Sequence, residues 1–268
     1  MRKTIFLFAL LAGTLSLQAQ NYPLRARLSD PNSFSVIVIP DPQSYTKFAA
    51  NQPLFELQTA WIAREIDSLR ILTALCTGDL VEQNENIVLN RKMLNQTSRE
   101  MWEAASHALA RLDGKVPYIV SPGNHDYGYR KAENSRTCFP DYFPFERNPA
   151  WRDVCVATYP NRNGDISLEN AAFAFDDPAW GGLLVVTTEF LPRDEVLDWA
   201  AALIDKPEYR DRKVIFMTHA FLHERSAKRI EKNSYELTPG NTGAEIWRKL
   251  IEPSPNIRMA VSYTHLRA

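Results

Sequence analysis

The sequence has little of what marks several classes of binding protein. Its 31 Lys and Arg residues are balanced by 32 Asp and Glu residues, and the net charge of −1 leaves no basic surplus for nucleic acid. A long basic run of the kind that binds acidic membranes is absent, as are low-complexity stretches and internal repeats. With 45% hydrophobic residues, the composition is that of an ordinary globular protein, for which no nucleic-acid partner is expected.

The chain begins with the pattern of a secretory signal peptide, residues 1–19. Arg2 and Lys3 form a positive segment, residues 5–17 are mainly apolar, and Ala19 is a small residue before the expected cleavage. The apolar stretch is short for a membrane span, although an uncleaved N-terminal anchor is the alternative. No cysteine follows it, which argues against bacterial lipid attachment. We therefore expect an exported protein, periplasmic or extracellular, without a stable membrane anchor.

Cysteine is scarce, and its three positions have different surroundings. Cys138 and Cys155 could pair within one loop region of an exported protein, or they could remain two separate thiols. Cys76 lies in an apolar run, so we expect it to be a buried free thiol.

The mature chain alternates predicted strands and helices. About 250 residues remain after the signal peptide, enough for one sizeable domain. Strands are predicted at residues 34–39, 72–76, 116–120, 183–187, 214–217 and 257–261, and helices at 54–69, 90–112, 192–204 and 243–251. Residues 127–169 are expected to form a long, irregular segment. This alternation predicts an α/β domain in which strands pack between helices.

Polar residues capable of binding metal follow four of the predicted strands: Asp41, Asp79, Asn124 and His219. A single Asp after a strand is usually a helix cap or a turn residue, but four such strand ends are harder to explain in that way. In sheets of this type, ligands gather beyond the carboxyl ends of the strands. At residues 123–126 (Gly-Asn-His-Asp), glycine permits a sharp turn, Asn offers a neutral oxygen, His an acid or base, and Asp an orienting carboxylate. This combination is typical of a metal-assisted hydrolase.

Four motifs resemble those of the calcineurin-like metallophosphoesterases in order and approximate spacing. They are Asp-x-Gln at residues 41–43, Gly-Asp at 78–79, Gly-Asn-His-Asp at 123–126 and Thr-His at 218–219. The resemblance spans roughly residues 35–261, and Gly-Asn-His-Asp is the most specific of the four. It implies a calcineurin-like β-sandwich of two mixed sheets flanked by helices, in four α/β/β/α layers. It also implies two divalent or mixed-valence metal ions, such as Mn, Fe or Zn, at the strand ends.

The resemblance implies a role for each metal-capable residue. Asp41 would bind the first metal ion, Asp79 would bridge both ions, and Asn124 and His219 would bind the second. Gln43 stands where the family more often has His, and its amide oxygen is a weaker ligand than imidazole. It would complete the first metal's ligands or only support them through a hydrogen bond.

His125 and Asp126 are the catalytic residues that the resemblance implies. His125 would protonate the leaving alkoxide or stabilise the phosphoryl oxygens, and Asp126 would orient His125 and stabilise its charge. Two cations about 3.5–4 Å apart neutralise an anionic phosphate ester and lower the pKa of a bridging water. The implied function is hydrolysis of a small phosphomonoester or phosphodiester by an exported enzyme with a binuclear metal centre and metal-activated water.

The end of the chain departs from the family pattern. The family's metal set normally finishes with Gly-His-x-His after a late strand, but residues 263–268 are Tyr-Thr-His-Leu-Arg-Ala. The ending from Val261 onward also resembles a translated sequencing adapter. We therefore expect a C-terminally incomplete phosphoesterase domain at residues 20–262 and a foreign tail at 263–268, with weak or no activity. His265 is not predicted to be a ligand.

Other candidates carry less weight. His107 is expected on a helix as an ordinary surface residue, and His223 in a loop rather than as a ligand. Glu189 follows the predicted strand at residues 183–187 and could interact with the metal ligands without binding the metal itself. The aromatic and basic residues of segment 127–169 would form either a small separate core or one wall of a substrate pocket, in which Arg or Lys would hold a phosphate.

Three other functions remain open on the residues alone. A non-catalytic secreted binding protein that retains the fold is favoured by Gln43 and by the atypical ending, and opposed by Asp79, His125 and Asp126. A nuclease of the same fold is weakened by the balanced charge. A glycosidase would explain Asp41 and Asp79 as paired carboxylates, but not the Asn and His beside them.

Overall fold

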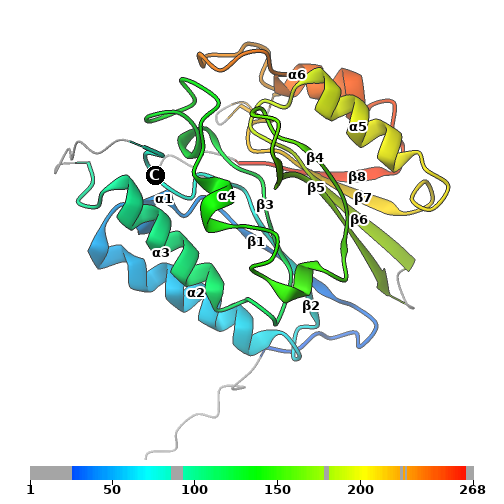
Figure 1. Cartoon of the computed structure of the whole chain (residues 1–268). Coiled ribbons are helices and arrows are strands. Elements are labelled where there is room, and N and C mark those ends of the chain that lie inside the picture. Colours follow the sequence, from blue (N-terminus) through cyan, green and yellow to red (C-terminus); the bar gives the residue numbers. More distant parts are fainter. Residues whose placement is uncertain (1–25, 86–92, 178–180, 224–225, 227, 264–268) are drawn as a thin grey trace, which may run out of the picture.

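Two β-sheets lie face to face and carry helices on their outer sides (Figure 1). The computed structural model describes residues 26–85, 93–177, 181–223, 226 and 228–263. The predicted signal peptide and residues 264–268 lie outside the described residues. The α/β architecture with two sheets flanked by helices confirms the predicted fold class.

The first sheet holds three parallel strands in the order β1-β2-β3. They are β1 (Ser35–Ile39), β2 (Ile71–Cys76) and β3 (Tyr118–Val120). Its outer helices are α1 (Gln43–Thr46), α2 (Gln52–Glu65) and α3 (Ser98–Ala110), with a 3-10 turn at Ala49–Asn51. Because the strands are parallel, their carboxyl ends meet at one edge, and one predicted motif follows each of the three strands there: residues 41–43, 78–79 and 123–126.

The second sheet is mixed and holds five strands in the order β4-β5-β6-β7-β8. They are β4 (Cys155–Pro160), β5 (Ile166–Asp177), β6 (Gly181–Thr187), β7 (Lys213–Met217) and β8 (Ile257–Val261). The pairs β4–β5 and β5–β6 are antiparallel, whereas β6–β7 and β7–β8 are parallel. Its helices are α5 (Asp194–Ile204), α6 (Gly243–Ile246) and a π-helical turn at Trp247–Ile251.

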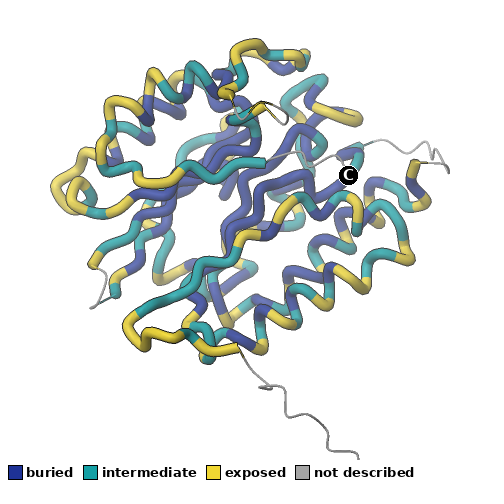
Figure 2. Tube along the Cα trace, turned by 180° about the vertical axis from the view of Figure 1, so that it is seen from behind, coloured by how far each residue is buried: buried dark blue, intermediate teal, exposed yellow. Residues whose placement is uncertain are grey.

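The main hydrophobic core lies between the sheets and under α2 and α3, and the central strands are buried along their length (Figure 2). It joins residues of both sheets, such as Leu75 and Val185, to the helix residue Trp102. A second core lies between the five-stranded sheet and α5, around Phe216 and Leu203. Two sheets packed in this way hold their strand ends in fixed relative positions, which a metal site requires.

The predicted helix at residues 90–112 is shorter than expected. Residues 90–92 lie outside the described part, and α3 begins at Ser98 because Thr97 caps it. The Thr97 hydroxyl accepts from the Glu100 amide at 3.2 Å, and the Glu100 carboxylate accepts from the Thr97 amide at 2.7 Å. This reciprocal capping box holds Thr97 in an extended conformation, so the helix cannot continue backwards through it.

The expectation of an irregular segment at residues 127–169 holds only up to residue 154, which precedes strand β4. The segment contains the short helix α4 (Phe139–Tyr142), the strand β4 and the start of β5. Strand β5 was missed because the fully buried Glu169 and Asn170 interrupt its apolar pattern. Most of the segment's buried aromatic residues, including Phe143 and Trp151, belong to the main core. Tyr127 instead joins Phe190, Leu191 and Leu237 in a small separate cluster.

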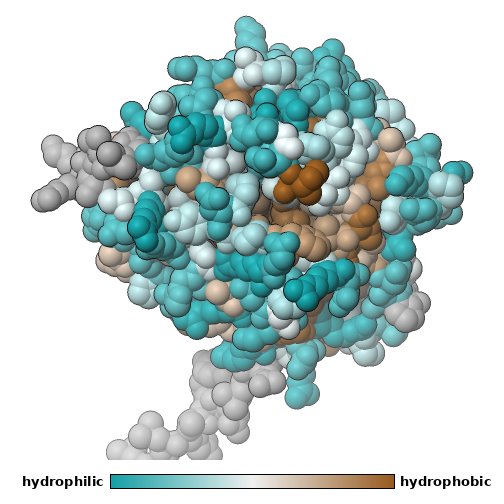
Figure 3. Space-filling model, in the orientation of Figure 1, coloured by the Kyte–Doolittle hydropathy of each residue, from teal (hydrophilic) through white to brown (hydrophobic). Residues whose placement is uncertain are grey.

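All three cysteines are free thiols, so the alternative of a Cys138–Cys155 pair is not what the structure has. The Cys138 sulfur lies 4.0 Å from the Asn84 carbonyl oxygen, and Cys76 is fully buried as predicted. Beside Cys155, Val156 of β4 and Ile166 of β5 are exposed. Figure 3 shows some apolar side chains among the mostly hydrophilic ones on this side of the molecule. None of the helices formed by the described residues is long and apolar enough to cross a membrane.

Candidate metal centre

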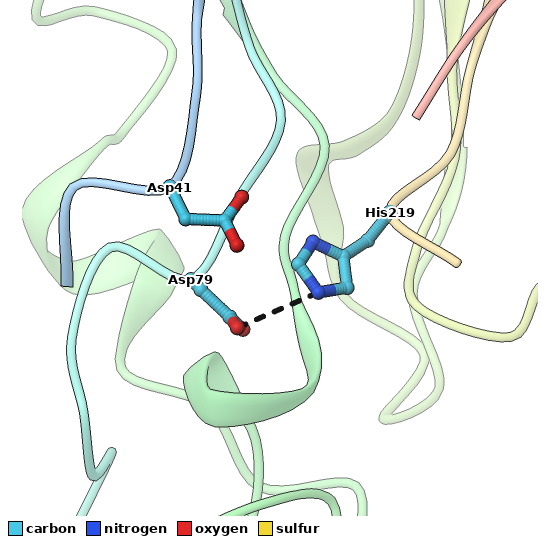
Figure 4. A group of neighbouring side chains, drawn as sticks. All are labelled: Asp41, Asp79 and His219. Atoms are coloured by element: carbon cyan, nitrogen blue, oxygen red, sulfur yellow. Dashed lines mark ion pairs between the residues drawn. The ribbon is translucent and has the colours of Figure 1, made fainter. Parts of the chain in front are cut away.

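Strand ends from both sheets bring two carboxylates and an imidazole together. Asp41 follows β1, Asp79 follows β2, and His219 follows β7 of the other sheet. One ligand atom from each of the three lies within 4.8 Å of the others. Figure 4 shows both carboxylates and the ring directed toward the same small space. The convergence that the strand ends predicted is therefore present.

The protonation of His219 leaves an electron pair facing this space. Its Nδ1 lies 2.7 Å from the Thr77 carbonyl oxygen, which can only accept, so Nδ1 carries the proton. Burial lowers the pKa of His219, which favours the neutral ring. The lone pair on Nε2 then faces Asn124 Oδ1 at 3.2 Å and Asp79 Oδ2 at 3.5 Å. Three electron-rich atoms converge there, an arrangement that a cation would stabilise.

Three buried oxygen atoms of the proposed metal ligands have no hydrogen-bond partner among the described residues. They are Asp41 Oδ2, Gln43 Oε1 and Asp79 Oδ2. Buried polar atoms are normally satisfied, because an unpaired one is destabilising by about 1–3 kcal/mol. Carboxylate, amide and imidazole donors together suit divalent metals of intermediate hardness. The residues present therefore fit a metal site.

The charge of Asp79 raises the pKa values of two neighbouring carboxyl groups. Burial, and then the charge of Asp79, raise the pKa of Asp41 to about 9, although the Thr77 hydroxyl donates to Asp41 Oδ1 at 2.9 Å. Burial and Asp79 likewise raise the pKa of Asp126 well above its usual value. Crowding buried acidic groups in this way is unfavourable without a nearby positive charge.

Two glycines allow the loops after β2 and β3 to approach closely. Gly78 has φ +99°, and a side chain there would meet the Ser121 carbonyl oxygen at 2.3 Å. A side chain on Gly123 would meet Asp79 Oδ1 at 2.2 Å and His219 Cε1 at 2.6 Å. Asp79 itself has φ +48°, a conformation that Asp adopts more readily than most residues. The two Gly motifs are therefore required by the packing of the site.

His125 lies beside Asp79 but is not oriented by Asp126, so that part of the prediction needs correction. The His125 amide donates to Asp79 Oδ1 at 2.8 Å, and its Nδ1 donates to the Glu82 carbonyl at 2.7 Å. The Asp126 carboxylate instead accepts from three backbone amides: Gly123 at 2.8 Å, Leu80 at 2.8 Å and Val81 at 3.3 Å. Asp126 therefore ties the two glycine loops together, because both of its oxygens are taken by the backbone.

A model of a known family matches the chain. It is described as calcineurin-like phosphoesterase, and the match covers residues 34–262, most of the chain. The chain belongs to the calcineurin-like phosphoesterase family. This membership confirms the family that the motifs predicted, one of metal-dependent phosphoric ester hydrolases.

Individual relatives of this calcineurin-like chain are distant. The uncharacterized protein YvnB of Bacillus subtilis (strain 168) is 26% identical over 223 residues, which are 80% of this chain and 14% of YvnB. The chain thus spans only a small part of that relative's length. A crystal structure of a dimetal phosphatase from Danio rerio is 14% identical, with 71% of this chain and 70% of that chain covered and a TM-score of 0.38.

The remaining candidates lie outside the group of ligand atoms. His107 is exposed on α3, with Nε2 3.8 Å from Glu56, and His223 is exposed in a loop. Glu189 is buried and paired with Arg193 at 2.8 Å and Arg162 at 3.5 Å, so its described ion pairs are with arginines and not with the ligand residues. None of the residues of segment 127–169 lines the cavity beside the ligands, which argues against the predicted wall with a phosphate-holding Arg or Lys.

Sequence reasoning missed residues that act through their backbone. The carbonyls of Thr77 and Glu82 orient His219 and His125, respectively. Any residue type provides a carbonyl, so Glu82 had no recognisable signal. Thr77 stands out in the sequence only as the residue before Gly-Asp. That position next to a proposed ligand is the one signal for the hydrogen bond that its hydroxyl donates to Asp41.

Replacing Asp126 by Asn tests its role in tying the loops. An amide group would turn an N–H toward at least one of the three backbone N–H donors, so we expect the free energy of unfolding to fall by about 2 kcal/mol. We expect kcat/KM to fall about 10- to 100-fold, as for groups that hold metal ligands in place. Urea unfolding and steady-state kinetics measure the two effects.

A matched variant separates this role from that of the neighbouring histidine. In His125→Asn the amide can still donate to the Glu82 carbonyl, so we expect lost activity with little lost stability. If Asp126→Asn kept full stability and changed only the pH profile of kcat/KM, the carboxylate would act through His125 after all.

Proposed function

We propose that this chain hydrolyses a small phosphomonoester or phosphodiester at a binuclear metal centre. The observation that carries the proposal is the convergence of the buried Asp41 and Asp79 carboxylates on His219, whose Nε2 is left with its lone pair. Membership of the calcineurin-like phosphoesterase family supports the same reaction class.

Five residues would hold the metal ions, as the family resemblance implies. Asp41 and Gln43 would bind one ion, Asn124 and His219 the other, and Asp79 would bridge them. When bound, the ions would neutralise the anionic phosphoester and lower the pKa of a water molecule that attacks phosphorus. The donation from His219 Nδ1 to the Thr77 carbonyl supports this assignment, because it aims Nε2 at the site and fixes the tautomer.

His125 would handle the proton of the leaving group. It is partly exposed while its neighbours Asn124 and Asp126 are buried, so it can reach a bound substrate. Since Nδ1 is engaged by the Glu82 carbonyl, Nε2 is the nitrogen available to donate a proton or to stabilise a phosphoryl oxygen.

We also propose that the protein is exported. The pattern of residues 1–19 supports a cleaved signal peptide, and export would place the enzyme in the periplasm or outside the cell. The size of the protein purified from a periplasmic or culture fraction, compared with that of the full precursor, measures cleavage.

Metal removal tests the proposed function. We expect purified protein to contain about two equivalents of divalent or trivalent metal by elemental analysis and to hydrolyse 4-nitrophenyl phosphate or bis(4-nitrophenyl) phosphate. Chelation should abolish turnover, because the proposed reaction depends on the positive charge of the bound metal. Re-addition of one metal from a panel of Mn²⁺, Fe²⁺ and Zn²⁺ should restore turnover.

The same experiment separates the non-catalytic alternative. Gln43 in place of the more usual His favours that alternative, since it weakens one ligand. Tight metal binding without any turnover across the panel would show a binding protein. Lack of metal binding would contradict both readings of the site.

A further inference from the structure

A cavity of about 430 Å³ opens beside two of the proposed metal ligands. Asn124, His219, Leu191 and Tyr263 line part of it, and the loop that follows β7 lines the rest, with Leu222, Ile230, Lys232 and Tyr235 among its residues. This volume is in the range of cavities that bind small organic ligands. A phosphoester whose phosphoryl group reached the ligands would therefore have room for a ring-sized group in the cavity.

The ring of Tyr235 is held in place by Phe190, which also contacts the ring of His219. It meets Phe190 edge to face, with ring centroids 5.0 Å apart, and Phe190 in turn meets the His219 ring at 5.8 Å. The backbone around Tyr235 is held by Asn233. The Asn233 Oδ1 accepts from the Tyr235 amide at 2.8 Å, and its Nδ2 donates to the Leu237 carbonyl. An aromatic side chain fixed in this way loses little entropy when it contacts a ligand.

The Tyr235 hydroxyl keeps its proton. Burial, followed by the charge of Asp79, raises the pKa of Tyr235 to about 12. At neutral pH the phenol is therefore a neutral donor within the electrostatic range of the metal centre, and a phosphoryl oxygen is a strong acceptor.

Lys232 adds the positive charge of the cavity wall. It is exposed, lines the same cavity, and has no ion pair with any residue that the structure describes. A lysine that is not already paired can attract an anionic substrate, and it favours the dianion of a phosphomonoester over the monoanion of a diester.

Leu222 and Ile230 are apolar, in contrast to Lys232, and they indicate the chemical character of the group that the phosphate is attached to. Both line the cavity and are partly exposed, so they offer apolar surface beside the cation and the phenol. An aliphatic polyol would leave this apolar surface in contact with water. An aromatic ring would cover the surface, and binding would be stabilised by about 25 cal/mol per Å² of apolar area buried.

We propose that this cavity selects phosphomonoesters of aromatic alcohols. Tyr235 donates to a phosphoryl oxygen, Lys232 attracts the dianion, and Leu222 and Ile230 pack against the aromatic leaving group. Hydrolysis adds a water oxygen to phosphorus, breaks the bond between phosphorus and the aryl oxygen, and gives inorganic phosphate and a phenol. The inference rests on the proposed phosphoesterase function and adds the substrate class to it.

Single variants test each part with two substrates. Metal-loaded wild type, Tyr235→Phe, Lys232→Gln and Leu222→Ala are compared on 4-nitrophenyl phosphate and glycerol 2-phosphate, and each variant is referred to wild type on the same substrate. We expect Leu222→Ala to raise KM about tenfold for the aryl ester and to change the alkyl ester less than about twofold. We expect Tyr235→Phe to lower kcat/KM about tenfold on both substrates.

The charge of Lys232 has its own readout. Lys232→Gln should weaken inhibition by inorganic phosphate about tenfold and flatten the salt dependence of kcat/KM. Lys206→Gln is the matched control, because Lys206 is exposed just beyond α5 and does not line the cavity. Ile230→Ala serves as a second apolar variant if Leu222→Ala fails to fold.

The outcomes separate this inference from the proposed function. Absence of turnover by metal-loaded wild type on both esters and on bis(4-nitrophenyl) phosphate would contradict the proposed function itself. If wild type turned over and the apolar variants reduced activity equally on the aryl and alkyl esters, the aromatic class would be wrong. If Tyr235→Phe and Lys232→Gln kept their metal content and showed unchanged kinetics and unchanged phosphate inhibition, the cavity would not be the substrate-binding site.

Discussion

Replacing Asp79 by Asn is expected to lower kcat/KM on an aryl phosphoester by at least about a thousandfold, roughly 4 kcal/mol of transition-state stabilisation. The substitution leaves the shape of the site almost unchanged. Asn can keep the oxygen that accepts from the His125 amide at 2.8 Å, and it tolerates the positive φ of +48° at this position. What is lost is the negative charge at Oδ2, which lies 3.5 Å from His219 Nε2 and would bridge the two ions.

Kinetics and elemental analysis measure the effect, and thermal unfolding of metal-free protein provides the contrast. Because Asp79 raises the pKa values of Asp41 and Asp126, removing its charge should leave the metal-free fold at least as stable as before. Asp205→Asn, at an exposed position after α5, is the control for a lost carboxylate. Retention of metal content and turnover in Asp79→Asn would be incompatible with a bridging role.

The second large effect is expected from Gly123→Ala. A single methyl group would lie 2.2 Å from Asp79 Oδ1, 2.5 Å from the Asp79 amide and 2.6 Å from His219 Cε1, so both ligands must move. Overpacking of this kind is destabilising by about 1–3 kcal/mol. Displacement of two metal ligands by even 1 Å can lower activity about a hundredfold. Denaturant unfolding and kcat/KM, measured on the same preparation, follow the two effects.

A second glycine shows what a methyl group does without crowding. Gly164 has φ +86°, but a side chain there would meet nothing within 4 Å, so Gly164→Ala should be destabilising by about 1–2 kcal/mol through backbone strain alone. Its activity should remain near that of wild type. Equal activity in the Gly123 and Gly164 variants would mean that the close approach at Gly123 is not needed for function.

The elements predicted from the sequence are those whose apolar runs are unbroken. Strands β1, β2 and β7 consist almost entirely of apolar residues, and each was predicted within a residue or two of its observed bounds. Strand β5 was missed because its buried Glu169 accepts from the distant Tyr127 hydroxyl as well as from the nearer Asn161 amide and Ser167 hydroxyl. A local apolar pattern cannot reveal that the tertiary fold brings the Tyr127 hydroxyl to this carboxylate.

The same distinction applies to the site. Parallel strands bring their carboxyl ends to one edge, so the sequence alone was enough to place Asp41, Asp79 and Asn124 together. The partner of Asp126 could not be predicted, because it is a set of backbone amides in a neighbouring loop and not a side chain. Tyr235 was likewise invisible, since its relation to His219 depends on the ring of Phe190 between them.

The division of the ligands between two sheets has a consequence for how the protein assembles. The contact between Thr77 and His219 joins positions 142 residues apart, and the two belong to different sheets. In the proposed metal centre, the three-stranded sheet contributes four ligands, and the five-stranded sheet contributes only His219. The complete ligand set would therefore form only when the two sheets have packed together, and metal binding would stabilise the finished sandwich more than either half.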